Sequence, residues 1–181
     1  IIPLGDNKVG LVLADVSGHG IPAALITGMI HAWCHATWKH NTQLSEFCSQ
    51  LNSYLHQYTI PEMYSSIFMG MLNTKSGELE YVLSGHPEPV LFANDKIQYT
   101  EQARQPVIGM LPSIPQYVYH LHFSQGDKLL IYSDGLSEHL LTVTATENKK
   151  ETDLLLSALG KAKDRNPECQ LTDIYDTIAP M

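Results

Sequence analysis

The stretch that most constrains this chain is an apolar run that ends in an aspartate and a glycine-rich turn. Residues 9–15 are almost all apolar and predict a buried strand, and Asp15 stands at its end. Residues 16–20 then predict a turn, and Pro22 suits the first turn of a helix over residues 22–40. A carboxylate at a strand end is held by the sheet while the loop beyond leaves space for water and a ligand. Asp15 is therefore a candidate ligand for a hard metal ion.

A second stretch of the sequence has the same build. Residues 128–133 predict a strand, and Asp134 and Gly135 follow it directly. Any single aspartate at a strand end more often caps a turn or a helix than binds a metal. Two in matching contexts suggest a metal site assembled from distant parts of one chain.

Other candidate residues carry weaker signals. Gly18 and Gly20, just before a helix, either present backbone N–H groups to a phosphate or form an ordinary tight turn. His19 between them is either a general acid or substrate contact, or a structural loop residue. His86 lies in a loop made rigid by two prolines, where it either reaches the site or holds the loop by hydrogen bonds.

The histidines leave a further alternative open. His31 and His35 stand four residues apart on the first predicted helix, a spacing compatible with metal binding. No glutamate follows the first of them, so a place on the helix surface or at an interface is favoured. The chain has nine histidines in all, and a zinc hydrolase remains a third reading.

The remaining pattern predicts an α+β sandwich, because many antiparallel strands alternate with inserted helices. On the first helix an apolar stripe of Met29, Ile30, Trp33 and Thr37 is expected. A second helix is expected over residues 42–58, with Thr42 as its cap and with Leu44, Phe47, Cys48, Leu51 and Leu55 facing inward. Further strands are expected over residues 64–72, 78–83, 89–93 and 117–123, and further helices over residues 147–163 and 171–178.

Length and composition narrow the class of protein. The 181 residues predict a single domain over residues 1–181, with enough apolar residues to bury a core. The net charge of −8 and the lack of a basic stripe disfavour nucleic-acid binding. No apolar run approaches the roughly 18 residues of a membrane span. Three cysteines without a C-x-x-C motif favour a reducing, cytoplasmic environment.

Four sequence motifs cover most of residues 9–140. They are the D-V-S-G-H-G turn at 15–20 with its helix, the S-G-H-P loop at 84–87, the P-V-I-G segment at 106–109, and G-D-K-L-L-I-Y-S-D-G at 126–135. Together, and in this order, the motifs resemble a known family, the metal-dependent (PPM, type-2C-like) serine/threonine phosphatases, in the bacterial branch of stage II sporulation protein E and RsbU.

The resemblance implies two packed, mostly antiparallel sheets flanked by helices, an αββα sandwich. It implies two Mn²⁺ or Mg²⁺ ions, with Asp15 bridging both, the backbone carbonyl of Val16 completing one and Asp134 binding the other. A metal-bridging hydroxide would attack the phosphorus, so no serine or cysteine nucleophile is assigned. His19 is then a weak catalytic candidate, and Gly18, Gly20 and His86 are expected to lie in the substrate loops.

The implied substrate is phosphoserine or phosphothreonine on a small regulatory protein, typically an anti-anti-sigma protein of the STAS type. The family's acidic ligand before Asp15 and its C-terminal D-D-x-T strand have no counterpart, so the chain is expected to be a fragment of a longer multidomain regulator, truncated at both ends. An N-terminal sensor or receiver domain and a homodimer are expected. The alternative is a catalytically weak or inactive phosphatase-fold binding module.

Overall fold

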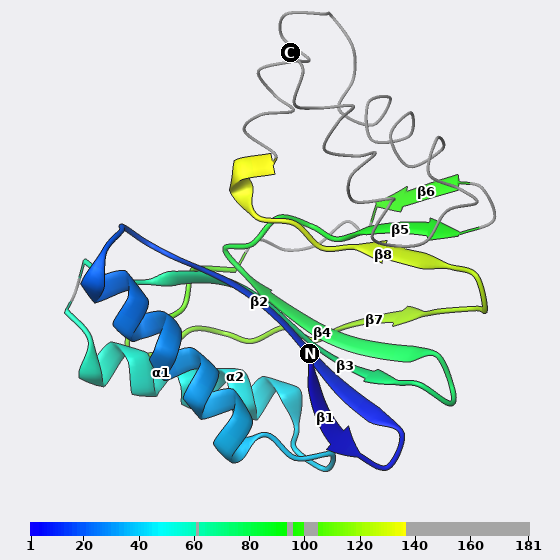
Figure 1. Ribbon diagram of the computed structural model, residues 1–181, viewed down its shortest axis with the longest axis horizontal. Helices are drawn as coiled ribbons and strands as arrows, with labels where there is room; N and C mark the ends of the chain where they lie inside the picture. The colour runs from blue at the N-terminus through cyan, green and yellow to red at the C-terminus, as the bar shows by residue number, and fades with distance from the viewer. Residues whose placement is uncertain (61, 94–95, 100–104, 137–181) are drawn as a thin grey trace, which may run out of the picture.

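Three layers make up the part of the chain that the computed structural model describes, which is residues 1–60, 62–93, 96–99 and 105–136. Helices α1 (Ile21–Thr37) and α2 (Leu44–Tyr58) cover one face of a five-stranded sheet, and a three-stranded sheet lies over its other face (Figure 1). The predicted α+β class with two antiparallel sheets is confirmed. The helices predicted over residues 147–163 and 171–178 lie outside the described residues.

Every pairing within the two sheets is antiparallel. The larger sheet has the order β1-β2-β3-β4-β7 and the smaller one the order β6-β5-β8. The strands of the larger sheet are β1 (Ile2–Gly5), β2 (Lys8–Val16), β3 (Ser65–Asn73), β4 (Glu78–Ser84) and β7 (Tyr119–His122). Those of the smaller sheet are β5 (Val90–Ala93), β6 (Lys96–Tyr99) and β8 (Lys128–Leu130).

Alternation along β3 divides its side chains between two apolar cores. Ile67, Met69 and Met71 pack against the helices, whereas Phe68 belongs to the core between the two sheets. The same period of two along β2 sends its odd-numbered residues, such as Leu11, toward the smaller sheet. The strand predicted as buried is therefore half-buried along most of its length, and only Gly10 is fully buried.

Helix α1 begins within one residue of the start predicted from Pro22, but it ends three residues before the predicted end at residue 40. Trp38 adopts an extended conformation instead of continuing the helix, and its ring fills the space that a side chain at Gly10 would need. The buried stripe consists of Ile26, Ile30 and Cys34. The prediction that Thr37 faces inward was wrong, because Thr37 is exposed and its hydroxyl donates to the carbonyl of Trp33.

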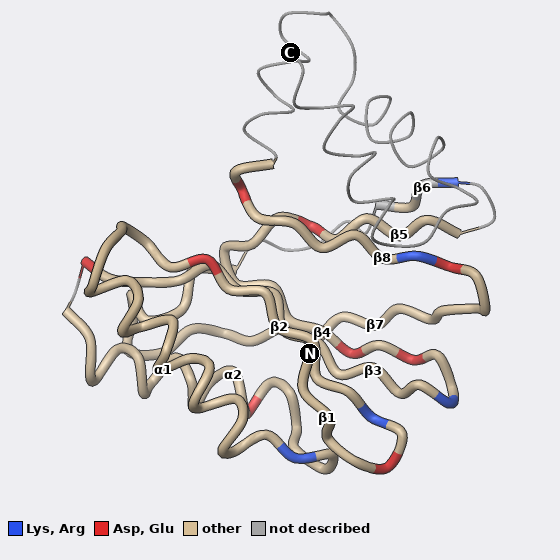
Figure 2. Tube along the Cα trace, viewed as in Figure 1, with Lys and Arg blue, Asp and Glu red and all other residues tan. Residues whose placement is uncertain are grey.

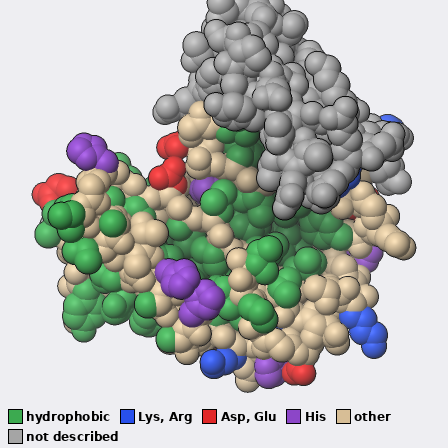
Figure 3. Space-filling view, in the orientation of Figure 1, with side chains coloured by type: hydrophobic (Ala, Val, Ile, Leu, Met, Phe, Trp, Pro, Cys, Tyr) green, Lys and Arg blue, Asp and Glu red, His purple; other side chains and the backbone are tan. Residues whose placement is uncertain are grey.

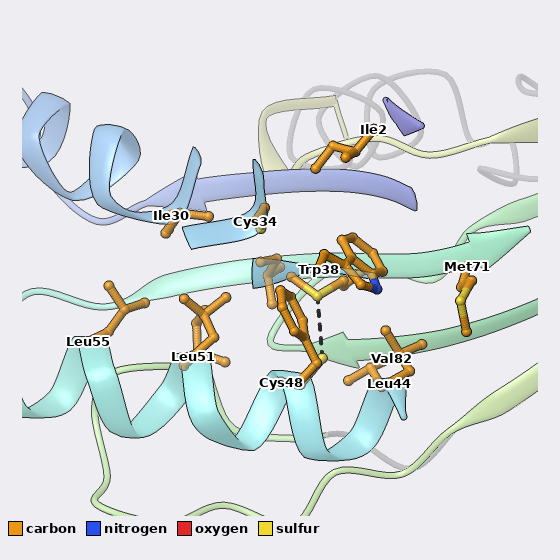
Figure 4. Packing of buried hydrophobic residues seen from close by; sticks show 14 of the residues in the cluster. Ile2, Ile30, Cys34, Trp38, Leu44, Cys48, Leu51, Leu55, Met71 and Val82 are labelled. Atoms are coloured by element: carbon orange, nitrogen blue, oxygen red, sulfur yellow. Dashed lines mark hydrogen bonds between the residues drawn. The ribbon is translucent and has the colours of Figure 1, made fainter. Parts of the chain in front are cut away.

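Helix α2 confirms all five of its predicted inward residues, which are buried against the sheet (Figure 4). Thr42 does not cap it. The N-cap position is Gln43, and the Thr42 hydroxyl instead accepts a hydrogen bond from the Lys39 N–H group at 3.0 Å. Thr42, which was predicted to cap α2, therefore stabilises the turn between the two helices instead.

Two of the cysteines lie in this helix-side core as free thiols. Cys34 and Cys48 are buried, and Cys48 Sγ lies 3.5 Å from Met69 Sδ (Figure 4). Burial raises the pKa of the Cys34 thiol to about 11 and raises the pKa of Cys48 as well. Both are therefore unreactive packing residues. Cys169 lies outside the described residues.

Helix α1 contains no Asp, Glu, Lys or Arg, and its exposed residues include large apolar ones. Ile21 and Leu25 are exposed, at 78% and 64% of their surface. His31 and His35 are exposed with ring centroids 4.3 Å apart, and Figure 3 shows histidine side chains together on this mostly apolar face. Among the described residues, no helix is long and apolar enough to cross a bilayer.

Alanine at two glycines of this region should have opposite effects. Gly20, at the N-cap of α1, has φ 79° and ψ −154°, a region accessible almost only to glycine, so Gly20→Ala should cost about 1–3 kcal/mol of unfolding free energy. Gly28 lies inside α1, and Gly28→Ala should add about 0.5–1 kcal/mol. An added Cβ would meet no atom within 4 Å at either position, so the contrast isolates the backbone. Urea unfolding measures both; a loss of equal size in the two variants would contradict this account of the turn.

Candidate metal centre

Three segments that are far apart in the sequence converge at one end of the sheets. They are the end of β2 with Asp15, the loop after β4 with His86, and the segment after β8 with Asp134. Figure 2 marks acidic residues at the end of β2 and after β8, and Figure 3 shows acidic side chains in a notch above α1.

The face of β2 explains where the Asp15 carboxylate points. Asp15 follows Leu11 and Leu13 at intervals of two, and those leucines pack into the core between the sheets. On the smaller sheet, Leu129 and Ile131 pack into the same core, three residues before Asp134. The strand predicted to run to residue 133 ends at Leu130, and a helical turn begins at Asp134. Both carboxylates therefore lie at the same end of the inter-sheet core.

The two carboxylates are close enough to perturb each other. The pKa of Asp15 is raised, first by partial burial, then by the negative charge of Asp134, and then by a hydrogen bond between the two side chains. Two facing carboxylates repel each other, and sharing a proton relieves that repulsion. A divalent cation between them would relieve it better, so this pair fits the donor set of a hard-metal site.

The backbone carbonyl of Val16 is directed away from β3. Val16 lies opposite Ser65 in the ladder, and both backbone groups of Ser65 pair with Ile108 at 3.0 Å on its other side. In an antiparallel ladder, residues at such a non-hydrogen-bonded position turn their N–H and C=O groups outward. This orientation is compatible with the ligand role predicted for the Val16 carbonyl, which stays a prediction.

His86 is held beside the two aspartates. Its side chain is only 8% exposed, and its Nδ1 atom lies 3.1 Å from the Ser66 hydroxyl, on the residue opposite Asp15 in the ladder. Its Nε2 atom is buried and has no hydrogen-bond partner among the described residues. Burial lowers the pKa of His86 to about 4, although the negative charge of Asp134 opposes this shift. His86 is therefore a neutral imidazole at physiological pH.

In the loop that follows Asp15, Ser17 is held by hydrogen bonds, whereas residues 18–20 are exposed. Ser17 donates its N–H to the Tyr64 carbonyl at 2.9 Å, and its hydroxyl accepts from the Tyr64 N–H at 3.0 Å. Beyond it, Gly18 and Gly20 have positive φ, as a turn of this kind requires. His19 is exposed and makes no hydrogen bond or ion pair with any described residue. The structure thus brings His86 to the aspartates and leaves His19 in the solvent-exposed turn.

Within the described part of the chain, no three histidine, cysteine or acidic side chains are clustered to hold a metal ion. The described donor set is therefore two carboxylates with a backbone carbonyl beside them. This weakens the zinc-hydrolase alternative, because His31 and His35 lie side by side without a third described ligand.

Two site residues carried no signal that sequence reasoning used. Ser65 is fully buried, and its hydroxyl lies 2.9 Å from the Asp15 carbonyl oxygen. Ser66 anchors His86. Ser65 and Ser66 begin a strand whose residues 67–72 are all apolar or glycine. The two polar residues at the start of that apolar run could have been recognised as candidate site residues.

Comparison with known proteins gives this arrangement a family. The family model described as "Stage II sporulation protein E (SpoIIE)" matches residues 5–181. The chain belongs to the SpoIIE family. The resemblance inferred from the four motifs is thereby confirmed.

Two curated SpoIIE-like relatives come from Bacillus subtilis. The phosphoserine phosphatase RsbU is 27% identical over 134 residues, covering 73% of this chain and 40% of RsbU. The phosphoserine phosphatase RsbP is 26% identical over 140 residues, covering 75% of this chain and 34% of RsbP. The chain thus spans well under half the length of either relative.

Solved structures agree with the fold. The RsbU and RsbW domains of a Mycobacterium tuberculosis protein superpose with a TM-score of 0.73 at 25% identity, covering 95% of this chain and 48% of that one. The PP2C phosphatase domain of Bacillus subtilis SpoIIE gives a TM-score of 0.70 at 15% identity, covering 97% and 52%. A structure of RsbX in complex with magnesium gives 0.69 at 14% identity, covering 99% and 76%. The two-sheet architecture of this chain is thus that of PP2C-type domains.

The buried imidazole predicts a specific pH dependence of stability. An unfolded histidine protonates near pH 6.5, whereas native His86 stays neutral down to about pH 4. As the pH falls, the unfolded state therefore takes up the proton first. The contribution of His86 is complete above about pH 6.5 and is lost progressively between about pH 6.5 and 4.

Urea unfolding between pH 7 and 4.5 measures this effect in the wild type and in His86→Asn, which has no imidazole to protonate. The wild type should lose stability more steeply than the variant over that range. His122→Asn, at an exposed position on β7, should follow the wild type. Parallel pH profiles for the wild type and His86→Asn would show that His86 is not the group responsible.

Proposed function

We propose that this chain is a metal-dependent protein serine/threonine phosphatase domain that hydrolyses phosphoserine or phosphothreonine on a regulatory protein. The observation that carries the proposal is the convergence of Asp15 and Asp134 from two different sheets. In such a reaction the protein supplies position and charge, and it needs no nucleophile of its own.

The residues of the chain have distinct parts in this proposal. Asp15 and Asp134, with the Val16 carbonyl, would hold two Mn²⁺ or Mg²⁺ ions. Bound divalent cations lower the pKa of water and neutralise charge on phosphoryl oxygens. Asp15 and Asp134 fix where that charge sits, because one is anchored in a ladder and the other follows a packed strand. His86, neutral and buried, has Nε2 left to hydrogen-bond a water or a substrate oxygen.

The loop of residues 17–20 would border the substrate. Gly18 and Gly20 leave open space beside the backbone, since an added Cβ at either would meet nothing within 4 Å. A phosphoprotein could therefore approach the carboxylates closely there. His19 is exposed in the same turn, and in this proposal it would contact the substrate.

The relatives support the substrate class and the setting. RsbU and RsbP are named phosphoserine phosphatases, and the mycobacterial protein joins an RsbU domain to an RsbW domain. By analogy we propose a phosphorylated STAS-type anti-anti-sigma protein as substrate, in the cytoplasm. The exposed apolar residues of α1 support an interface on that face. Two occupants of that interface stay predictions: a sensor or receiver domain of the same protein, and a second copy of this chain.

One observation favours a second candidate function. The described residues bring together only two acidic ligands, and such a pair binds cations more weakly than a fuller set. A phosphatase fold that binds a partner without turning it over would retain the aspartates and bind little metal.

Phosphate release tests the first candidate directly. The 181-residue chain with Mn²⁺ should release phosphate from a phosphoserine-bearing STAS domain, and a chelator should abolish release. Asp15→Asn and Asp134→Asn should each lower the rate by about a hundredfold or more, because each removes charge that positions the cations. Asp6→Asn is the matched control, since Asp6 is an exposed partner of His40 in the β1–β2 turn.

Thermal unfolding with and without Mn²⁺ separates binding from catalysis. Metal that binds the native state should raise the unfolding temperature of the wild type and Asp6→Asn but not of the two site variants. If both site variants release phosphate at the wild-type rate, the phosphatase proposal is wrong. If Mn²⁺ stabilises neither the wild type nor the control and no phosphate is released, the binding-module candidate is the better account.

A further inference from the structure

A buried asparagine of α2 is connected to the metal-site end of β2 by hydrogen bonds that pass through residues 108–109 and Ser65. Asn52 is 1% exposed and stands on the core-facing side of α2, between Leu51 and Leu55. A polar side chain in that position is costly unless its hydrogen-bonding groups are satisfied. The hydrogen-bond partners of the Asn52 side chain therefore indicate its structural role.

Both the oxygen and the nitrogen of the Asn52 side-chain amide form hydrogen bonds with one segment, residues 105–112. Its Oδ1 atom accepts from the Gly109 N–H at 2.9 Å, and its Nδ2 group donates to the Leu111 carbonyl at 3.0 Å. One helical turn later, His56 Nδ1 lies 3.1 Å from the Gly109 carbonyl oxygen. Side chains of α2 therefore hold both backbone groups of Gly109.

The same segment is clamped to the start of β3. Ile108, next to Gly109 and 1% exposed, forms two backbone hydrogen bonds with Ser65, each 3.0 Å long. The segment also accepts a hydrogen bond from the loop that carries His86, because the Gly85 N–H donates to the Gln105 carbonyl at 2.9 Å. Residues 105–112 thus connect α2 with the loop that carries His86 and with the start of β3, which pairs with the end of β2.

The last step runs from Ser65 to Asp15. The Ser65 hydroxyl lies 2.9 Å from the Asp15 carbonyl oxygen and 2.8 Å from that of Ser66, so its single proton is shared between them. This residue is 0% exposed, and no water competes for the contact. The position of the Ser65 backbone, which Ile108 fixes, therefore bears directly on the backbone of Asp15.

We propose that Asn52 is a positioning residue for the metal site: by holding residues 109–111 to α2 it fixes Ser65, and through Ser65 the backbone that carries the Asp15 carboxylate. This inference rests on the proposed function for its metal-binding consequence, whereas the relay of hydrogen bonds stands without it.

Three variants test the relay at different points. Asn52→Ala removes the link between α2 and the segment. Ser65→Ala removes only the hydroxyl between the segment and Asp15. Leu51→Ala is the matched control, because it truncates the neighbouring, fully buried residue of α2 and leaves the contacts of Gly109 and Leu111 in place.

Amide hydrogen exchange of the metal-free chain reports the relay itself. After correction for global stability, Asn52→Ala should speed exchange about tenfold at Gly109, whose N–H it frees, and also at Ser65 and Ser17, which lie further along. Ser65→Ala should affect Ser17 and spare Gly109. Leu51→Ala should leave the corrected rates at all three amides unchanged.

Calorimetric titration with Mn²⁺ reports the consequence for the site. Asn52→Ala and Ser65→Ala should each weaken Mn²⁺ binding by about 10- to 100-fold, the range seen when supporting hydrogen bonds of metal ligands are removed. The double variant should lose little more than either single one, because both act on one path. Leu51→Ala should bind Mn²⁺ as the wild type does.

The outcomes separate this inference from the proposed function. If Asn52→Ala changes exchange only at residues 109–111 and binds Mn²⁺ normally, the positioning role is overturned. If it weakens Mn²⁺ binding no more than Leu51→Ala does, the effect is general destabilisation and the proposal is likewise wrong. If the wild type itself binds no Mn²⁺, the proposed function fails, and the exchange rates at Ser65 and Ser17 still decide whether the relay exists.

Discussion

The uninterrupted ladder between β2 and β3 is the constraint on which the candidate site depends. Nine successive residue pairs, from Lys8 with Asn73 to Val16 with Ser65, fix the register of the two strands. A slip by one residue would turn Asp15 from the inter-sheet side to the helix side, because side chains alternate with a period of two. The apolar residues of β2 and β3 pack on both faces, so the register is held by two cores at once.

The second sheet must then be aligned with the first for Asp134 to meet Asp15. Apolar contacts contribute to this alignment, because Leu129 and Ile131 pack against the core around Phe68 and Tyr81 of the larger sheet. Hydrophobic contact is non-directional and would tolerate a small sliding of one sheet on the other. Directional contacts near the site add to it: the side chains of Asp15 and Asp134 are hydrogen-bonded to each other, and the loop between β4 and β5 is held by hydrogen bonds of His86 with Ser66 and of Gly85 with Gln105.

Sequence reasoning found what is periodic or local and missed what is long-range. Six of the eight described strands, both described helices and the convergence of Asp15 with Asp134 followed from apolar runs and turn residues or from the family motifs, whereas β1 and β6 were not predicted. The cap of α2 was misplaced because Thr42 and Gln43 are adjacent, and the backbone geometry of the helix–helix turn decides between them. The contacts of Asn52 with residues 109–111 could not be foreseen, since nothing local pairs an asparagine with backbone groups more than fifty residues away.

If the proposed metal site is formed by the described residues alone, the position of each ligand matters more, because there are few of them. Mg²⁺ and Mn²⁺ prefer about six oxygen ligands, and Mg²⁺ in particular keeps several waters when it acts on phosphates. The described residues supply two carboxylates and one outward-facing carbonyl, which leaves room for water and a phosphoryl group. With so few protein ligands, a shift of one carboxylate removes a large part of the charge that holds the cations. Asp15 has its backbone oxygen held by a fully buried hydroxyl in the β2–β3 ladder, whereas Asp134 lies at the start of a helical turn. Of the two carboxylates proposed as ligands, Asp15 is therefore the one whose backbone is anchored within a sheet.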